Sequence, residues 1–235
     1  MTNSSYAGTE LETFALASNW KAYYRDLLSE YIAGDVLEVG AGIGSTTVSL
    51  CRCGHRRWVC LEPDPELAKK IAILREAKQL PDCFEIRVGT VEDLDEREKF
   101  DTISYIDVLE HIQEDGKEAR EAARRLRSGG HLIVLSPAHP ALYTTFDAAI
   151  GHYRRYTKQS LSRVVPEEMK VRKLFYADSI GLIASLSNRY VLKSAMPTRS
   201  QILLWDRVLV RLSRLFDGLF FYRIGKSVIG VWQKV

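Results

Sequence analysis

Short runs rich in β-branched residues alternate with longer amphipathic runs over most of this chain, and this alternation constrains its fold most strongly. A strand, a crossover helix and a second strand form the repeating unit of a parallel β-sheet. Seven runs are predicted to be strands: 35–39, 57–62, 84–88, 100–106, 131–136, 171–176 and 227–233. The sequence therefore predicts an α/β fold with a doubly wound sheet.

The runs between the predicted strands have the composition of crossover helices. We predict helices over 45–52, 65–78 and 113–127, the last of which stops at Gly129 and Gly130. Residues 11–31 predict a leading helix over the edge or mouth of the sheet. Residues 138–166 are rich in aromatic and basic side chains and follow the fifth strand, so we expect an insertion over the active face.

The segment 201–222 combines charged residues at helical spacing with a broad apolar surface. Leu, Val, Phe and Trp fill the faces between the charged residues. The charged residues are Asp206, Arg207, Arg211, Arg214 and Asp217. We predict a helix that caps the sheet or forms a homodimer face, in preference to a helix on a membrane surface, which would have the same pattern.

Composition and charge exclude several classes of protein. The chain has 235 residues, 46% of them hydrophobic, so a single domain spanning 1–235 is expected. A net charge of +3 is too small to suggest nucleic acid as a partner. The sequence has neither a signal-peptide pattern nor an uncharged run near the roughly 20 apolar residues of a membrane span, so a cytoplasmic protein is expected.

The cysteines indicate neither a disulfide framework nor a metal site. Cys51, Cys53 and His55 form a C-x-C-x-H pattern that lacks a second ligand pair and falls where a helix should end. We therefore predict no metal ligands.

A glycine turn joins the first predicted strand to the helix that follows it. Gly40 and Gly42 let a ligand approach the backbone where any Cβ would block it, and the N–H groups of the helix start can bind an anion. Glu38 precedes the first glycine by two residues. A carboxylate there suits the cationic amino group or sulfonium of S-adenosylmethionine, whereas it would repel a dinucleotide pyrophosphate.

Glu62 ends the second predicted strand, about 20 residues after the glycine turn. A carboxylate at this place can accept hydrogen bonds from both hydroxyls of a ribose. This position indicates an adenosine-type ligand, but it does not distinguish S-adenosylmethionine from a nicotinamide dinucleotide.

Four ordered segments, 36–42, 89–94, 100–112 and 126–134, resemble the successive motifs of class I S-adenosylmethionine-dependent methyltransferases. The run 146–157, which contains Gly-His-Tyr-Arg-Arg-Tyr, further resembles a bacterial subgroup of that family. The resemblance implies a Rossmann-like methyltransferase fold, in which a seven-stranded, mostly parallel sheet has an antiparallel last strand. It implies S-adenosylmethionine as the cofactor and S-adenosylhomocysteine as its product.

The resemblance also assigns cofactor contacts position by position. Glu38 and the turn residues would line the methionine part, Glu62 the ribose, and Asp107 the methyl donor. The turn residues are Gly40, Ala41 and Gly42, and the residues that would line the adenine are Pro63, Thr90 and Val91. Thr90 departs from the family pattern, because many relatives carry Asp there to bind the adenine amino group.

Methyl transfer is an in-line displacement at a carbon that the sulfonium already activates, so the protein mainly positions the reactants and excludes water. A hydroxyl or protonated amine acceptor needs a base, for which His152 in the insertion is the first candidate and His111 the second. A purely structural role for His152 is the alternative. Tyr153, Arg154 and Arg155 are candidate substrate-binding residues for a carboxylate or phosphate.

The sequence thus predicts a methyltransferase for a small-molecule acceptor, apolar if the 201–222 helix closes the pocket. Residues 1–34 would form an N-terminal helical segment, 35–138 the cofactor-binding core, and 139–166 with 178–223 the acceptor-side insertions and cap. A nicotinamide-dependent oxidoreductase and a non-catalytic, cofactor-binding partner protein are the alternatives. Weak membrane-surface association would be compatible with the cap.

Overall fold

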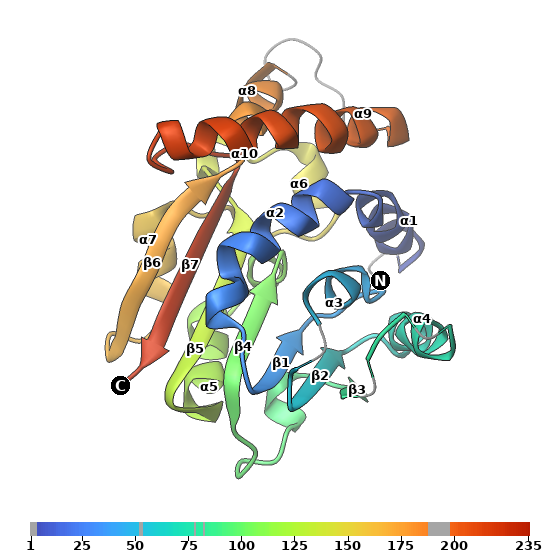
Figure 1. Ribbon diagram of the computed structural model, residues 1–235, viewed down its shortest axis with the longest axis vertical. Helices are drawn as coiled ribbons and strands as arrows, with labels where there is room; N and C mark the ends of the chain where they lie inside the picture. Colours follow the sequence, from blue (N-terminus) through green and yellow to red (C-terminus); the bar gives the residue numbers. More distant parts are fainter. Residues whose placement is uncertain (1–3, 52–53, 78, 82, 188–197) are drawn as a thin grey trace.

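The computed structural model describes residues 4–51, 54–77, 79–81, 83–187 and 198–235. Seven strands form one sheet in the order β3-β2-β1-β4-β5-β7-β6 (Figure 1). Their bounds are β1 Asp35–Val39, β2 Arg57–Glu62, β3 Phe84–Val88, β4 Phe100–Ile106, β5 Leu126–Pro137, β6 Met169–Ala177 and β7 Ser227–Lys234. Strand β7 is antiparallel to both of its neighbours, and the pairs among β1 to β5 are parallel. The predicted fold class is confirmed.

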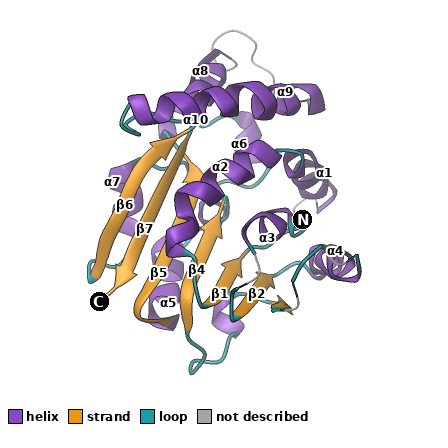
Figure 2. Cartoon of the chain, in the orientation of Figure 1, coloured by secondary structure: helices purple, strands orange, loops and turns teal. Residues whose placement is uncertain are grey.

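Helices cover both faces of the sheet (Figure 2). One core contains residues of α2 (Ser18–Leu28), α3 (Ser45–Leu50) and α4 (Pro65–Glu76), and the other contains residues of α5 (Asp115–Arg125) and α7 (Lys158–Val164). Successive strand residues alternate between the two cores: Val36 and Trp58 face α2, whereas Leu37 and Val59 face α5. Because both faces of the sheet are covered, β1 and β4 are buried along nearly their whole length.

The strand β5 begins before the glycines that were expected to stop the preceding helix. Helix α5 ends at Arg125, and Leu126 already pairs with Phe100 of β4 and is buried. The pairing shifts register between Phe100 and Thr102, and Gly129 (φ +80°) lies in this irregular stretch. The helix prediction to residue 127 was therefore wrong at its end, because burial of Leu126 in the sheet outweighs local helix propensity.

The leading segment is two helices rather than one. Helix α1 covers Ser4–Ala15 and α2 covers Ser18–Leu28, followed by the 3₁₀ turn Ser29–Tyr31. The carboxylate of Asp206, far along the chain, accepts hydrogen bonds from the backbone N–H groups of Asn19 (3.2 Å) and Trp20 (2.9 Å). The carboxylate satisfies N–H groups that have no acceptor within the helix, and this stabilises the start of α2. The positive end of the helix dipole in turn favours the negative charge of Asp206.

The cap lies beyond the carboxyl ends of the parallel strands (Figure 1). It consists of α8 (Ser179–Ser187), α9 (Arg199–Leu204), the π-helical turn Trp205–Leu209 and α10 (Val210–Leu219). The predicted charged face is corrected, because Asp206 and Asp217 are 1% and 0% exposed. Asp217 accepts hydrogen bonds from the Tyr23 hydroxyl (2.8 Å) and from the backbone N–H groups of residues 178 (2.7 Å) and 179 (2.9 Å).

The insertion after β5 contains the short turn Pro140–Leu142, helix α6 (Thr145–Ala149) and α7. Further 3₁₀ turns occur at Val91–Asp93 and Leu109–His111. None of the helices that the structure describes is both long and apolar enough to cross a bilayer.

Replacement of Asp217 by Ala should lower the free energy of unfolding by about 3 kcal/mol, because it leaves three buried donors without their acceptor. Asp26→Ala is the matched control, since Asp26 pairs with Arg214 across the exposed side of the same α2–α10 contact. An exposed pair contributes no more than about 1 kcal/mol. Urea unfolding of both variants measures the difference, and equal losses would contradict the central role of Asp217.

Candidate active site

The glycine turn after β1 depends on backbone geometry that other residues rarely adopt. Gly40 has φ +67° and Gly42 φ +57°. A Cβ on Gly40 would lie 2.6 Å from Cγ2 of Val108, which follows β4. The helix after the turn, α3, has only six residues, so its dipole contributes little to anion binding. The turn itself brings the backbone to the edge where β1, β2 and β4 end.

Glu62 is tied directly to the glycine turn. Its Oε2 accepts a hydrogen bond from Gly42 N–H (2.7 Å) and its Oε1 accepts one from Asp64 N–H (3.0 Å). Burial raises the pKa of this carboxyl, and the two backbone donors oppose that shift. Each oxygen retains a lone pair for a further donor. The exposed Pro63 follows directly, and the arrangement fits the two hydroxyls of a ribose.

Glu38 lies beneath the turn, inside the α2 side of the core. It is 2% exposed, and its Oε2 accepts a hydrogen bond from Trp58 Nε1 (2.8 Å). Burial raises the pKa of Glu38 to about 7. The carboxylate supports the strand beneath the turn, and its contact with the methionine part stays a prediction.

The residues expected at the adenine have limited side-chain freedom. Thr90 caps the following turn, and its hydroxyl donates to Asp93 Oδ2 at 2.8 Å. Val91 is fully buried in the core on the α5 side, and Ala41 is buried in the other core. Because the Thr90 hydroxyl already donates its proton to Asp93, it would meet an adenine amino group as a hydrogen-bond acceptor.

Asp107 follows β4 with a left-handed backbone (φ +54°), which Asp tolerates better than most residues. Its N–H donates to Leu135 O of β5 at 2.8 Å. The residue reaches solvent, yet the surrounding protein raises its pKa, against the opposing charges of His152, Lys226 and Lys21. Asp107 is thus an exposed carboxylate whose cationic neighbours come from distant parts of the chain.

Two further titratable residues near Asp107 come from the N-terminal helices and were not predicted. Lys21 is 8% exposed and donates to Phe14 O (2.7 Å), and burial lowers its pKa to about 8. Glu10 has a pKa raised to about 7 by burial and by the negative charges of Asp107 and Asp147. Each occupies an ordinary position in an amphipathic helix, so no local signal marks it.

His152 forms a buried pair with Asp147. Its side chain is 7% exposed, and its Nδ1 lies 3.1 Å from Asp147 Oδ1. Burial alone would raise the pKa of Asp147, but hydrogen bonds from His152 and Arg155 hold it well below its ordinary value. An ionised Asp147 favours a proton on Nδ1, which leaves Nε2 as the basic nitrogen.

The other histidines have different surroundings. The His111 ring stands nearly perpendicular to that of His152, with 4.5 Å between centroids. Although the residue is exposed, desolvation by the surrounding protein, followed by the charge of His152, lowers its pKa to about 4. His111 is therefore neutral at pH 7. His139 stacks on Tyr176, and its Nε2 lies 2.9 Å from Gly225 O, so it belongs to the contact between the insertion and β6–β7.

Glu110 is fully buried beside His152 and was also not predicted. Its Oε2 accepts from the Ser136 hydroxyl (2.9 Å), whereas its Oε1 has no hydrogen-bond partner and lies 3.9 Å from His152 Nε2. Burial, followed by the negative charge of Asp107, raises its pKa strongly. Glu110, His111 and His152 each offer one metal-ligand atom within 4.8 Å of the others. This group is separate from the C-x-C-x-H pattern of Cys51, Cys53 and His55, of which Cys53 lies outside the described residues.

The predicted substrate residues Tyr153, Arg154 and Arg155 line one pocket, but the two arginines pair with different carboxylates. Arg155 binds both oxygens of Asp147 (2.8 and 3.0 Å), while Arg154 pairs with Asp115 (2.6 Å). An open pocket of about 540 Å³ is lined by both arginines and by Tyr153, among others. The carboxylate contacts of Arg155 use its Nε and Nη2, and that of Arg154 uses its Nη1, so each guanidinium keeps further N–H donors for an anion.

Residues 37–134 match a family model described as a methyltransferase domain. Residues 37–134 therefore form a class I methyltransferase domain. The cofactor of such a domain is S-adenosylmethionine. The match covers the glycine turn, Glu62 and Asp107, but ends before the Gly-His-Tyr-Arg-Arg-Tyr run, so the subgroup resemblance stays a prediction.

Curated relatives are distant and longer. A ubiquinone biosynthesis O-methyltransferase of Bradyrhizobium diazoefficiens is 29% identical over 42% of this chain and 38% of its own length. The ajmaline N-methyltransferase of Rauvolfia serpentina is 27% identical over 80% of this chain and 60% of its own length. The chain thus spans less than two thirds of both relatives.

Solved structures extend the likeness in fold beyond the matched methyltransferase domain. A chain from the complex of the Haloferax volcanii Trm112 methyltransferase activator with a putative methyltransferase has a TM-score of 0.66 at 14% identity, over 99% of this chain and 95% of that one. A putative sarcosine dimethylglycine methyltransferase of Galdieria sulphuraria has a TM-score of 0.62 at 16% identity, over 92% and 84%. At such identities the likeness establishes the fold alone.

The raised pKa of Glu38 predicts a pH-dependent stability. The folded state holds the proton up to about pH 7, whereas the carboxyl of the unfolded chain releases it near its ordinary pKa of 4.5, so this group makes the fold less stable as pH rises through that interval. Glu38→Gln should therefore reduce the loss of unfolding free energy between pH 5 and pH 8 by on the order of 2 kcal/mol. Denaturant unfolding at both pH values, with the exposed Glu66→Gln as control, tests this; parallel curves for Glu38→Gln and the parent protein would contradict it.

Proposed function

We propose that this protein transfers the methyl group of S-adenosylmethionine to a small, largely apolar acceptor. The observation that carries the proposal is the hydrogen bond from Gly42 N–H to Glu62 Oε2, which joins the two cofactor features at the edge where Asp107 also lies. The carboxylates of Glu62 and Asp107 beside the glycine turn fit an adenosine ligand with a cationic centre better than a dinucleotide, whose pyrophosphate is anionic.

The bound cofactor would supply a methyl group on a sulfonium, and the protein would position it. Gly40, Ala41 and Gly42 present backbone to the methionine part, and Glu62 accepts from the ribose. Asp107 places negative charge near the donor. Lys21 is a buried cation close to Asp107, which suits it to the methionine carboxylate.

His152 is the proposed base for the acceptor proton. Asp147 holds Nδ1, so Nε2, which lies 3.9 Å from Glu110 Oε1, would take the proton from a hydroxyl or ammonium during transfer. The neutral His111 ring packs against it and limits its movement. We assign His111 a positioning role rather than a second proton transfer.

An aromatic group next to this site supports an apolar acceptor. Trp205 of the cap lies with its ring centroid 6.0 Å from that of Trp20 and 6.5 Å from that of Phe14, and Phe14 lies 6.5 Å from Phe146. Lys226, which interacts with Asp107, lies 4.3 Å from the centre of the Trp205 ring. The inner side of the cap therefore provides an apolar wall close to the charged groups.

Two of the relatives are named for O-methylation in ubiquinone biosynthesis and for N-methylation of ajmaline, so the comparisons leave the acceptor atom open. An anionic acceptor bound by Arg154 or Arg155 is a second candidate. Equal rates for an acid and its neutral ester would exclude it.

Cofactor binding is tested by isothermal titration with S-adenosylmethionine and S-adenosylhomocysteine, beside NAD and NADP. Glu62→Gln should weaken both sulfur ligands about 10- to 100-fold, as expected for the loss of hydrogen bonds to a charged acceptor. Glu66→Gln, an exposed change four residues away, should have no effect. Binding of a nicotinamide instead would overturn the proposal.

The base is tested by His152→Gln, which should lower kcat about 100- to 10,000-fold while the Kd of S-adenosylmethionine changes little. Activity near that of the parent protein would exclude His152 as base. Treatment with a chelator is a necessary control: activity that is lost with EDTA and restored by a divalent cation would assign Nε2 to metal binding instead. Cofactor binding without turnover of any acceptor would favour the non-catalytic alternative.

A further inference from the structure

The outer side of the cap exposes a continuous series of apolar side chains. Five of them recur along α9, the π-helical turn and α10 at spacings of three or four residues, and α8, which packs against α10, exposes two more. These residues, which we call the outer apolar face, are Ile183, Leu186, Leu204, Val208, Leu212, Leu215 and Leu219. Leu215 and Leu219 are 67% and 66% exposed. A monomeric protein rarely leaves so many neighbouring large apolar side chains in water.

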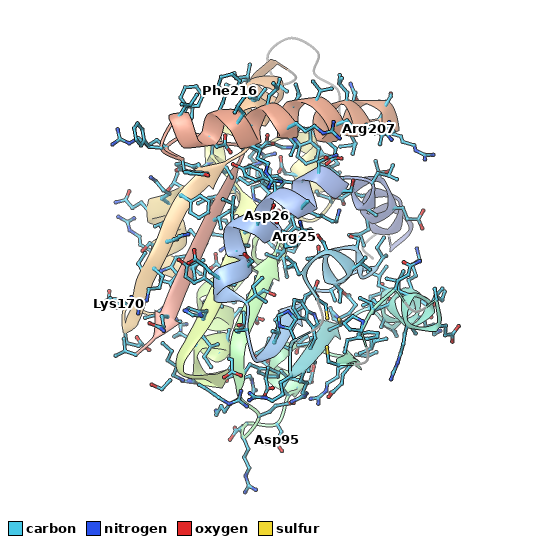
Figure 3. The ribbon with its side chains drawn as sticks, viewed as in Figure 1. Arg25, Asp26, Asp95, Lys170, Arg207 and Phe216 are labelled. Atoms are coloured by element: carbon cyan, nitrogen blue, oxygen red, sulfur yellow. The ribbon has the colours of Figure 1, made fainter. Side chains whose placement is uncertain are left out.

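The charged side chains exposed on the described part of the cap are all positive. Between residues 198 and 225 the exposed charged side chains are Arg199, Arg207, Arg211, Arg214 and Arg223. The two acids of this stretch, Asp206 and Asp217, are buried and bind backbone N–H groups. Figure 3 shows Phe216 and Arg207 on the cap helix, at the opposite end of the molecule from Asp95.

The arginines differ in how firmly they are held. Arg214 pairs with Asp26, and Arg211 donates to Asn19 Oδ1 (3.2 Å), both on α2. Within the described part of the chain, Arg199, Arg207 and Arg223 have no carboxylate partner. Arg223 instead lies over the ring of the exposed Phe221 (5.9 Å). These three guanidinium groups are available to an outside anion.

We propose that the outer apolar face docks on a bilayer that contains anionic phospholipid. Leucine side chains beside arginines, with no exposed acid, match a surface whose headgroups are negative and whose interior is apolar. Long arginine side chains can keep their charge at the headgroups while leucines enter the boundary. A second copy of the chain fits less well, because a symmetric contact would bring arginines against arginines.

Docking in this way would place the site close to the membrane. The cap helix turns Trp205 inward, toward Phe14 and Lys226, and its leucines outward. Only the thickness of one helix, about 10 Å, then separates the bilayer from the aromatic wall. The proposal goes beyond methyl transfer, because it concerns where the protein meets an apolar acceptor and does not depend on the chemistry.

Vesicle sedimentation with the full chain tests the proposal. We expect binding to vesicles of phosphatidylcholine with phosphatidylglycerol, far weaker binding to phosphatidylcholine alone, and a decline as NaCl rises. The double variant Leu215→Glu/Leu219→Glu should lose binding at least tenfold. Arg207→Gln and Arg223→Gln should each reduce it about fivefold, the contribution of one basic residue at an anionic surface.

The matched control is Ile73→Glu, which introduces a charge at an exposed apolar position of α4, outside the cap. It should bind vesicles as the parent protein does. Circular dichroism and titration with S-adenosylmethionine should be unchanged in every variant, so a failure of docking is distinguishable from a failure of the proposed function.

Three results would overturn the proposal. The first is absence of binding to the anionic vesicles, and the second is equal binding by the parent protein and the double leucine variant. The third is a dimer in light scattering that the double leucine variant converts to a monomer without any vesicle binding, because the face would then join two copies of the chain.

Discussion

Buried carboxylates join the cap to the rest of the molecule. Asp206 binds the start of α2, and Asp217 binds Tyr23 and the start of α8. Asp178, which is fully buried, accepts from Trp205 Nε1 (2.8 Å) and the Ser213 hydroxyl (2.7 Å). Each carboxylate is satisfied by several donors, which is the condition under which a buried charge is tolerated. These contacts fix which side of the cap helix faces inward, and the apolar wall and the outer apolar face both follow from that choice.

The candidate site is a balance of charges in a partly enclosed space. Carboxylates of Glu10, Asp107 and Asp147 face the cations Lys21 and Lys226. Enclosure raises the pKa of Glu10 to about 7 and lowers that of Lys21 to about 8, so both titrate near neutral pH. Asp147 stays ionised because His152 and Arg155 bind it. A ligand that carries an ammonium, a carboxylate and a sulfonium would enter a site that already contains counter-charges.

Local pattern was sufficient for the first half of the fold. The bounds of β1 to β4 agree with the prediction because each is a short run between turn signals; β1, β2 and β4 are mostly buried, whereas only Phe84 of β3 is. The glycine turn and Glu62 were also identifiable, since their spacing follows from the length of one crossover helix. The prediction fails at two boundaries. Pairing of Leu126 with β4 ends helix α5 early, and the carboxylate of the distant Asp206 stabilises the start of α2.

The sequence by itself determined the central strands and the glycine turn that lies close to Glu62, because these depend on periodicity and spacing within short windows; its resemblance to known motifs gave the class of domain. It did not determine that Asp206 and Asp217 point inward while leucines point outward, since helical spacing is the same in either orientation. Nor did it place Lys21 and Glu10 beside Asp107. Burial and the electrostatic field at a residue depend on neighbours from other parts of the chain, and only the tertiary structure brings those neighbours together.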